Sequence, residues 1–132
     1  MVAVSEAAVK YIGTGRCFED AATMAWLVFS CAKHPDAAVV HGLCVFPPGH
    51  PDEGETFSHA WLEWDGKVWE YAIRSSDGEK VVDSADSKIF YLAYQVRETT
   101  KYSLSQFLRL TVEKGDGPWE ELYKRHRNPP AR

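Results

Sequence analysis

An Asp-Gly dipeptide between two strand-like runs is the feature that most restricts the fold of this chain. The runs are Phe57 to Trp64 and Lys67 to Ile73, and Asp65-Gly66 joins them. Asp-Gly is among the strongest short signals for a two-residue turn that closes an antiparallel hairpin. The sequence therefore predicts an antiparallel sheet built around this hairpin.

The length of the turn also predicts which residues face one another. Counting outward from the turn, His59 should face Ala72 and Trp61 should face Glu70. Because side chains alternate between the two faces of a sheet, His59 and Glu70 then lie diagonally on one face, within reach of each other. Glu63 points to that face too, but it lies roughly 13 Å from His59 at about 3.3 Å per residue. Glu70 is therefore the better candidate to orient His59.

Hydrophobic periodicity predicts the other elements. Apolar residues at three- and four-residue steps predict a strong helix from about Cys17 to Lys33, in which Glu19 and Asp20 complement the N-terminal dipole. The remaining predicted elements are a short helix over Ser5 to Tyr11, strands over Ala38 to Phe46 and Ile89 to Arg97, helices over Ser103 to Lys114 and from Pro118 to about Arg127, a loop over Pro47 to Thr56, and a polar loop over Ser75 to Lys88 with a short edge strand at Val81-Val82.

The amount of apolar sequence indicates one globular domain. The chain has 132 residues, of which 45% are hydrophobic and 26% charged, and a chain of this length buries roughly two-thirds of its unfolded surface without help from disulfides or metals. We expect one α+β domain over residues 1–127, in which the helix carrying Cys17 packs on the antiparallel sheet and two C-terminal helices complete the core. Residues 128–132 are expected to form a disordered tail.

Charge and hydropathy exclude several classes of protein. The net charge is −4, and the basic cluster of Lys124, Arg125 and Arg127 is terminal. A nucleic-acid partner, which needs a basic face, is therefore not expected. No apolar run approaches the roughly 18 residues of a membrane span, and the N-terminus lacks the pattern of a signal peptide. The expectation is a cytoplasmic protein without a membrane partner.

Cys17 is the candidate nucleophile. It follows a Gly-Thr-Gly-Arg loop and begins the strongest helix, where free backbone N–H groups and the helix dipole stabilise a thiolate and are placed to hold an oxyanion. The alternative is that Cys17 packs as a small apolar residue at a helix start. Cys31 and Cys44 fall on apolar faces and are expected in the core, and the irregular spacing of the three cysteines fits reduced thiols better than disulfides.

Metal binding is the competing interpretation of the histidines. His41 and Cys44 are three residues apart on a predicted strand, so their side chains point to opposite faces. His50 lies in a proline-rich loop, which leaves His59 without a set of co-ligands. We therefore expect no metal site.

Taken together, these residues resemble a known family. A cysteine at a helix start, then His59-Ala60-Trp61-Leu62-Glu63, then Trp69-Glu70 after a short turn, is similar to the transglutaminase-like branch of the papain-like superfamily. The resemblance covers about residues 13 to 73, and Glu70 stands where the family usually has Asp. It implies a papain-like core and a catalytic triad of Cys17, His59 and Glu70, with Glu63 or Asp83 as the alternative third members.

The resemblance also implies a chemistry. Cys17 would attack a carboxamide or ester carbonyl of a protein, a peptide or a small amide, with no cofactor, as a thiol protease, an amidase or an amine acyltransferase does. Phe18 takes the place of the usual aromatic neighbour of the nucleophile, and Tyr11 is the nearby side-chain donor. Trp61 either belongs to the core or forms the wall of a substrate groove. The alternative is an inactive module that keeps this fold and binds a protein or peptide partner.

Overall fold

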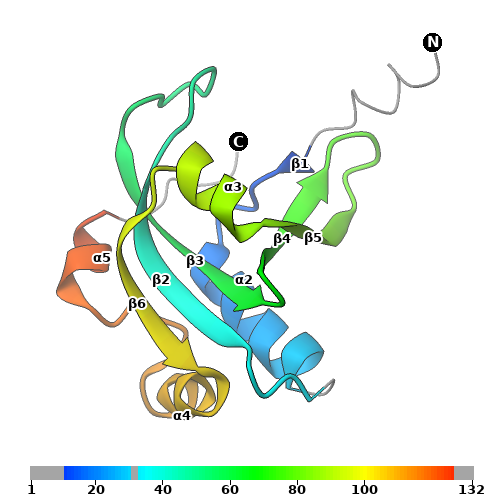
Figure 1. Cartoon of the computed structure of the whole chain (residues 1–132), viewed down its shortest axis with the longest axis vertical. Coiled ribbons are helices and arrows are strands. Elements are labelled where there is room, and N and C mark those ends of the chain that lie inside the picture. Colours follow the sequence, from blue (N-terminus) through cyan, green and yellow to red (C-terminus); the bar gives the residue numbers. More distant parts are fainter. Residues whose placement is uncertain (1–10, 31–32, 127–132) are drawn as a thin grey trace.

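The fold is α+β, with a helix packed on an antiparallel sheet and short helices at the C-terminal end. A computed structural model describes residues 11–30 and 33–126. The strands run in the order β1-β4-β3-β2-β6, and β5 pairs with β4 (Figure 1). They are β1 (Tyr11–Ile12), β2 (Ala38–Val45), β3 (Thr56–Trp64), β4 (Lys67–Arg74), β5 (Lys80–Asp86) and β6 (Arg97–Ser103).

The predicted hairpin is present, but its two strands stay paired only near the turn. Asp65 and Gly66 both have positive φ, 56° and 69°, as this turn type requires. Trp64 pairs with Lys67, and the ladder ends two pairs later at Leu62 and Trp69. The predicted pairs of His59 with Ala72 and of Trp61 with Glu70 are therefore wrong.

Strands β3 and β4 separate because β4 pairs with other strands beyond the turn. Strand β5 occupies one edge of β4 from Lys67 to Ile73. On the opposite edge β3 is replaced by β1, whose Ile12 pairs with Ile73. Between these two ladders β3 and β4 diverge, and the sheet opens.

Helices cover the two faces of the sheet. Helix α2 (Cys17–Met24) and the π-helix η1 (Ala25–Phe29) share a core with Ala60 and Leu62 of β3. Helix α3 (Ser87–Ala93) places Phe90 in a second core, with Trp61, on the other face. Figure 1 shows α3 in front of the sheet and α2 behind it.

The start of the long helix confirms the prediction, and its second half differs from it. Helix α2 begins at Cys17 as expected, but the α-helical pattern gives way to η1 at Ala25, and η1 ends at Phe29 rather than continuing to Lys33. Met24 and Ala25 are fully buried. The tertiary packing of this segment, which periodicity does not report, therefore sets the geometry of its last turn.

The predicted strand over Ile89 to Arg97 is wrong. The Asp86 side chain accepts hydrogen bonds from the backbone N–H groups of Lys88 and Ile89 at 2.9 and 3.2 Å, which starts α3 instead. Ile89 and Leu92 are 65% and 80% exposed, so this apolar run is not a buried strand. The strand that joins the sheet, β6, begins only at Arg97.

The polar segment before α3 also differs from the prediction. Sequence indicated a loop with a two-residue edge strand, whereas β5 pairs with β4 along seven residues from Lys80 to Asp86. Gly78, with φ of 73°, lies in the turn between the two strands. This segment is therefore a strand because it pairs with β4, although its polar sequence does not predict one.

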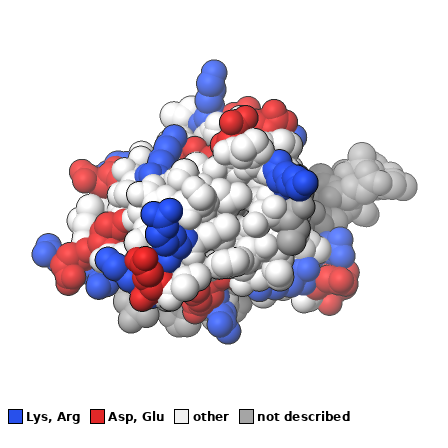
Figure 2. All heavy atoms as spheres, turned by 90° about the horizontal axis from the view of Figure 1, so that it is seen from below, with Lys and Arg blue, Asp and Glu red and all other residues white. Residues whose placement is uncertain are grey.

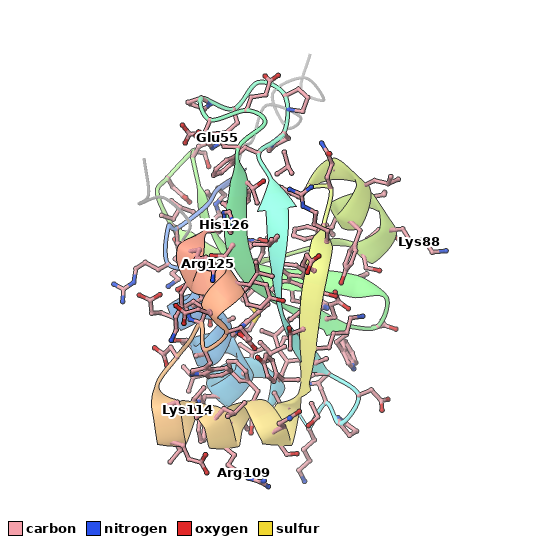
Figure 3. The ribbon with its side chains drawn as sticks, turned by 90° about the vertical axis from the view of Figure 1, so that its left-hand side faces the viewer. Glu55, Lys88, Arg109, Lys114, Arg125 and His126 are labelled. Carbon is pink, nitrogen blue, oxygen red and sulfur yellow. The ribbon has the colours of Figure 1, made fainter. Side chains whose placement is uncertain are left out.

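The C-terminal helices confirm one prediction and correct another. Helix α4 (Leu104–Lys114) begins where the Ser103 hydroxyl accepts from the Gln106 N–H and ends at Gly115. Helix α5 (Glu121–Arg125) begins later than the predicted start at Pro118, because Trp119 packs in the core against His41. In Figure 3 Arg125 and His126 mark the end of α5, in front of β3, and the Ser58 N–H donates to the His126 carbonyl.

Two further predictions fall partly or wholly outside the described residues. Residues 5–10 of the predicted helix over Ser5 to Tyr11 lie outside them. Tyr11, the last residue of that predicted helix, belongs to β1, where it pairs with Arg74. The tail over 128–132 lies outside them completely. Among the helices of residues 11–30 and 33–126, none has the length and apolar character to cross a bilayer.

Candidate active site

A cavity of about 480 Å³ opens where β3 and β4 separate. Its walls come from the loop before α2, the first turn of α2, the separating strands, β5, α3 and the loop after β2. The polar and aromatic side chains that line it include Cys17, Asp20, His59, Trp61, Glu70, Asp83, Phe90 and Tyr94. The gap in the sheet thus collects all three residues of the predicted triad in one cavity.

The separation of the strands explains how Cys17 and His59 meet. Cys17 begins α2, which packs on one face of the sheet. His59 is two residues from Trp61 and therefore points to the other face, which α3 covers. A continuous β3–β4 ladder would keep the two side chains apart, and the opening between the strands lets both reach one cavity.

His59 is oriented by Glu70. Its Nε2 atom lies 3.3 and 3.4 Å from the two carboxylate oxygens of Glu70, and the side chains are 18% and 26% exposed. Its Nδ1 atom is buried and makes no hydrogen bond of normal geometry with any described residue. Besides Glu70, the Cys17 thiol is the cavity-lining group that acts most strongly on the His59 ring.

The electrostatics of His59 agree with this arrangement. Burial of the ring favours its neutral form, but the charges of Cys17 and Glu70 outweigh burial and hold the pKa of His59 well above its ordinary value of 6.5. The thiol is thus near enough to act on the ring without yet having good hydrogen-bond geometry, which is common before a substrate binds. A raised pKa favours the protonated, positively charged form of the His59 ring.

Cys17 occupies the first turn of α2, where backbone N–H groups are not used inside the helix. The Asp20 N–H is the first to close the helix, by donating to the Arg16 carbonyl at 2.8 Å. The preceding N–H groups are available to an oxyanion beside the Cys17 sulfur. Cys17 itself is 8% exposed, so its thiol opens toward the cavity rather than the outer surface.

The buried carboxylate of Asp20 holds the loop before Cys17 in place, a role that no local pattern in the sequence predicts. Asp20 is 6% exposed, and its two oxygens accept hydrogen bonds from the Thr14 hydroxyl and, at 2.7 Å, from Lys80 Nζ. Thr14 Oγ1 also accepts from the Arg16 N–H at 3.1 Å. The sequence predicts for Asp20 only an interaction with the helix dipole, and its partner Lys80, 60 residues away in the chain, cannot be recognised from local spacing.

Trp61 both belongs to the core and lines the cavity. It is fully buried, its ring centroid lies 5.6 Å from that of His59, and its Nε1 donates to Glu63 at 2.9 Å. The Tyr91 hydroxyl donates to the same carboxylate, and Lys101 Nζ lies 3.2 Å from it. Glu63 is therefore engaged away from His59, which leaves Glu70 as the orienting acid.

A glycine on the neighbouring strand makes room for Trp61. Gly42 pairs with His59 across β2 and β3, and a Cβ atom there would lie 3.1 Å from Trp61 Cη2 and from a methyl group of Thr99. Such distances are shorter than normal van der Waals contact. The absence of a side chain at Gly42 thus lets the indole pack beside His59, with the two rings tilted by 36°.

Of the other two predicted substrate contacts, the structure describes the side chain of Phe18, which lies away from the cavity. Phe18 is 4% exposed and packs edge-on against His41, with ring centroids 4.8 Å apart, on the α2 side of the sheet. It does not line the cavity, because the position after Cys17 on the helix points into the core. The backbone of Tyr11 belongs to β1, and its side chain lies outside the described part of the chain.

Cys44 is an inert thiol beside the same site. It is fully buried between the sheet and α3, and burial raises its pKa to about 12. Cys31 lies outside the described residues. His41 and Cys44 do belong to opposite faces, as predicted, and within residues 11–30 and 33–126 no group of three or more metal-ligating side chains has the arrangement of a metal site.

Comparisons with known proteins add no name to this geometry. No family model, no curated protein and no solved structure matches the chain. The site itself combines a thiol at a helix start, an imidazole in the same cavity and a carboxylate 3.3 Å from that imidazole.

Proposed function

We propose that this protein is a cysteine-dependent acyl-transfer enzyme with a core like that of the transglutaminase-like branch of the papain-like superfamily. The observation that carries the proposal is the position of His59, between the Cys17 thiol and the Glu70 carboxylate in one cavity. Nucleophile, base and orienting acid are the minimum set for nucleophilic acyl transfer.

The first half of the reaction forms a thioester. The Cys17 thiolate attacks the carbonyl carbon of an amide or ester, and the N–H groups at the start of α2 hold the resulting oxyanion. The oxyanion then collapses, the bond to the leaving nitrogen or oxygen breaks, and the proton on His59 passes to that leaving group. Glu70 keeps the imidazole in position and stabilises its charged form.

The second half releases the acyl group. Neutral His59 now removes a proton from water or from an amine, which attacks the thioester carbon and returns the sulfur as a thiolate beside imidazolium. Water yields hydrolysis and an amine yields transfer, and both use the same three residues. The cavity is lined mainly by apolar and aromatic side chains, which suits the side chain of a peptide or a small amide.

A binding module is the second candidate, and one observation favours it. Cys17 is 8% exposed, so the thiol is shielded and the cavity would also suit a partner that is held without reaction. Figure 2 shows that on one face of the molecule basic and acidic side chains are interspersed rather than gathered by sign. A protein or peptide segment that inserts an apolar side chain is the partner such a module would take.

Acyl-enzyme formation separates the two candidates. The protein is incubated with 4-nitrophenyl acetate, and the acetylated residue is identified by peptide mass spectrometry. An enzyme should acetylate Cys17 and release nitrophenolate in a burst, and His59→Ala should slow that burst about a hundredfold, the low end of the effect of a general base. Cys44→Ala is the matched control and should leave the burst unchanged. Acetylation of other residues but not of Cys17 would support the binding module.

A further inference from the structure

The side chains that line the cavity include more acidic than basic groups, and this excess bears on the charge of the substrate. Three carboxylates line the cavity, those of Asp20, Glu70 and Asp83, whereas no Lys or Arg of the described residues does. Asp20 is neutralised by Lys80, and Glu70 is held by His59. Asp83 makes no ion pair within the part of the chain that the structure describes.

Asp83 faces the triad directly. It is the cross-strand partner of Glu70 on β4 and β5, so the two carboxylates project from the same face of the sheet. Like charges at directly opposed positions of two strands destabilise a sheet. Burial and the charge of Glu70 raise the pKa of Asp83, against the lowering effect of its hydrogen bond with the Ser84 backbone, as expected for a carboxylate without a nearby counter-charge.

Aromatic rings complete the surroundings of Asp83. Phe90 and Tyr94 of α3 line the same cavity, with their ring centroids 4.9 Å apart. Burial and the charges of Glu70 and Asp83 raise the pKa of the Tyr94 hydroxyl, while His59 lowers it, so this ring lies within the field of all three groups. A carboxylate beside aromatic faces is a suitable environment for an organic cation.

We infer that the substrate of this cavity carries a positively charged group, an ammonium or a guanidinium, and that Asp83 is the residue that selects it. The cation lies between Asp83 and the rings of Phe90 and Tyr94 while Cys17 attacks the carbonyl. This inference rests on the proposed function, because it assumes that the reacting carbonyl is delivered to Cys17.

Charged thiol reagents test the inference without a known substrate. Three methanethiosulfonates are used: the cationic trimethylammonioethyl reagent, the anionic sulfonatoethyl reagent and the neutral methyl reagent. In each case the Cys17 thiolate attacks the reagent sulfur, a disulfide forms, and methanesulfinate leaves. Rates are measured on the Cys17 peptide by mass spectrometry and divided by the rates of free cysteine with the same reagents.

The wild-type protein should prefer the cationic over the anionic reagent. Asp83→Asn should reduce that preference roughly 25-fold, because the cationic reagent loses and the anionic reagent gains about the fivefold factor for one unit charge within about 4 Å in water. Asp83→Ser removes the same charge with a different side chain and should give the same loss, which guards against a folding defect peculiar to one variant. Asp65→Asn is the matched control. It removes one negative charge in an exposed turn outside the cavity, where an Asn-Gly pair is equally suitable.

The neutral reagent keeps the two proposals distinguishable. A Cys17 that reacts no faster than Cys44 with the neutral reagent would overturn the proposed function and this inference with it. A Cys17 that reacts rapidly with the neutral reagent, but whose charge preference is the same in wild type, Asp83→Asn and Asp65→Asn, would overturn the inference alone.

Discussion

The Glu70 carboxylate lies 3.3 Å from Nε2 of His59 although the strands that carry the two residues are no longer paired there. The contact therefore depends on side chains that span an opening in the sheet, not on neighbouring backbone positions. The same opening admits the start of α2 and with it Cys17. One break in a ladder thus creates both the cavity and the arrangement of the triad.

Replacing Glu70 by Gln should lower the pKa of His59, because the Glu70 charge is one of the two that raise it. NMR titration of the His59 ring measures this directly. Glu63→Gln removes an acid of the same face that is bound to Trp61 and Tyr91, and should leave the His59 titration unchanged. A larger shift in Glu63→Gln than in Glu70→Gln would show that the wrong acid has been assigned.

The raised pKa of His59 also predicts how the free energy of unfolding depends on pH. The pKa of His59 is higher in the folded protein than its ordinary value of 6.5, so protonation of His59 favours the folded state. This contribution is fully present below pH 6.5 and is lost as the pH rises through the folded pKa. Urea denaturation across this range should show the loss in the wild type, and a smaller loss in Glu70→Gln.

Sequence sufficed for features that depend on local signals. The Asp65-Gly66 turn, the start of α2 at Cys17 and the Ser103 and Gly115 ends of α4 are each encoded by a few adjacent residues, and all are present. The His59–Glu70 contact was predicted from a hairpin register that holds for only three residue pairs. It forms because the two long side chains still reach each other.

Features that depend on distant residues could not be predicted in this way. The opening of the sheet requires β1 to take the edge of β4, and Asp20 finds Lys80 across 60 residues. The apolar run around Ile89 has the composition of a strand, but the Asp86 cap and the packing of Phe90 make it a helix. Tertiary context overrides local propensity at these positions.

Asp20→Ala should destabilise the protein by about 2 kcal/mol, because it leaves Thr14 and Lys80 without the carboxylate that they both bind. Glu19→Ala is the matched control on the same turn. Glu19 is exposed and its contact with Arg16 is a surface pair at 3.6 Å, so its loss should cost no more than about 0.5 kcal/mol. Chemical denaturation compares the two variants, and equal losses would mean that the Asp20 network is not structural.

Gly42→Ala should displace Trp61, since the added methyl group would lie 3.1 Å from the indole. Overpacking of this kind costs about 1 to 3 kcal/mol in a buried site. Gly13→Ala is a suitable control, because a Cβ there meets no atom within 4 Å. Tryptophan fluorescence and thermal unfolding report the change, and a Gly42→Ala protein as stable as Gly13→Ala would contradict the close packing of Trp61 beside His59.

The rate of Cys17 alkylation as a function of pH tests the central claim most directly. The wild type, His59→Ala and Glu70→Ala are treated with iodoacetamide from about pH 5 to 9, the range that spans the ordinary pKa values of imidazole and thiol. Cys44 is the internal control, and circular dichroism verifies that each variant is folded. We expect Cys17 to react rapidly well below the roughly 8.5 pKa of a free thiol. His59→Ala should abolish this low-pH reaction, and Glu70→Ala should weaken it less. Cys44 should remain unmodified, because burial raises its pKa to about 12. A wild-type Cys17 that titrates like a free thiol, with the same profile in folded His59→Ala, would contradict the triad.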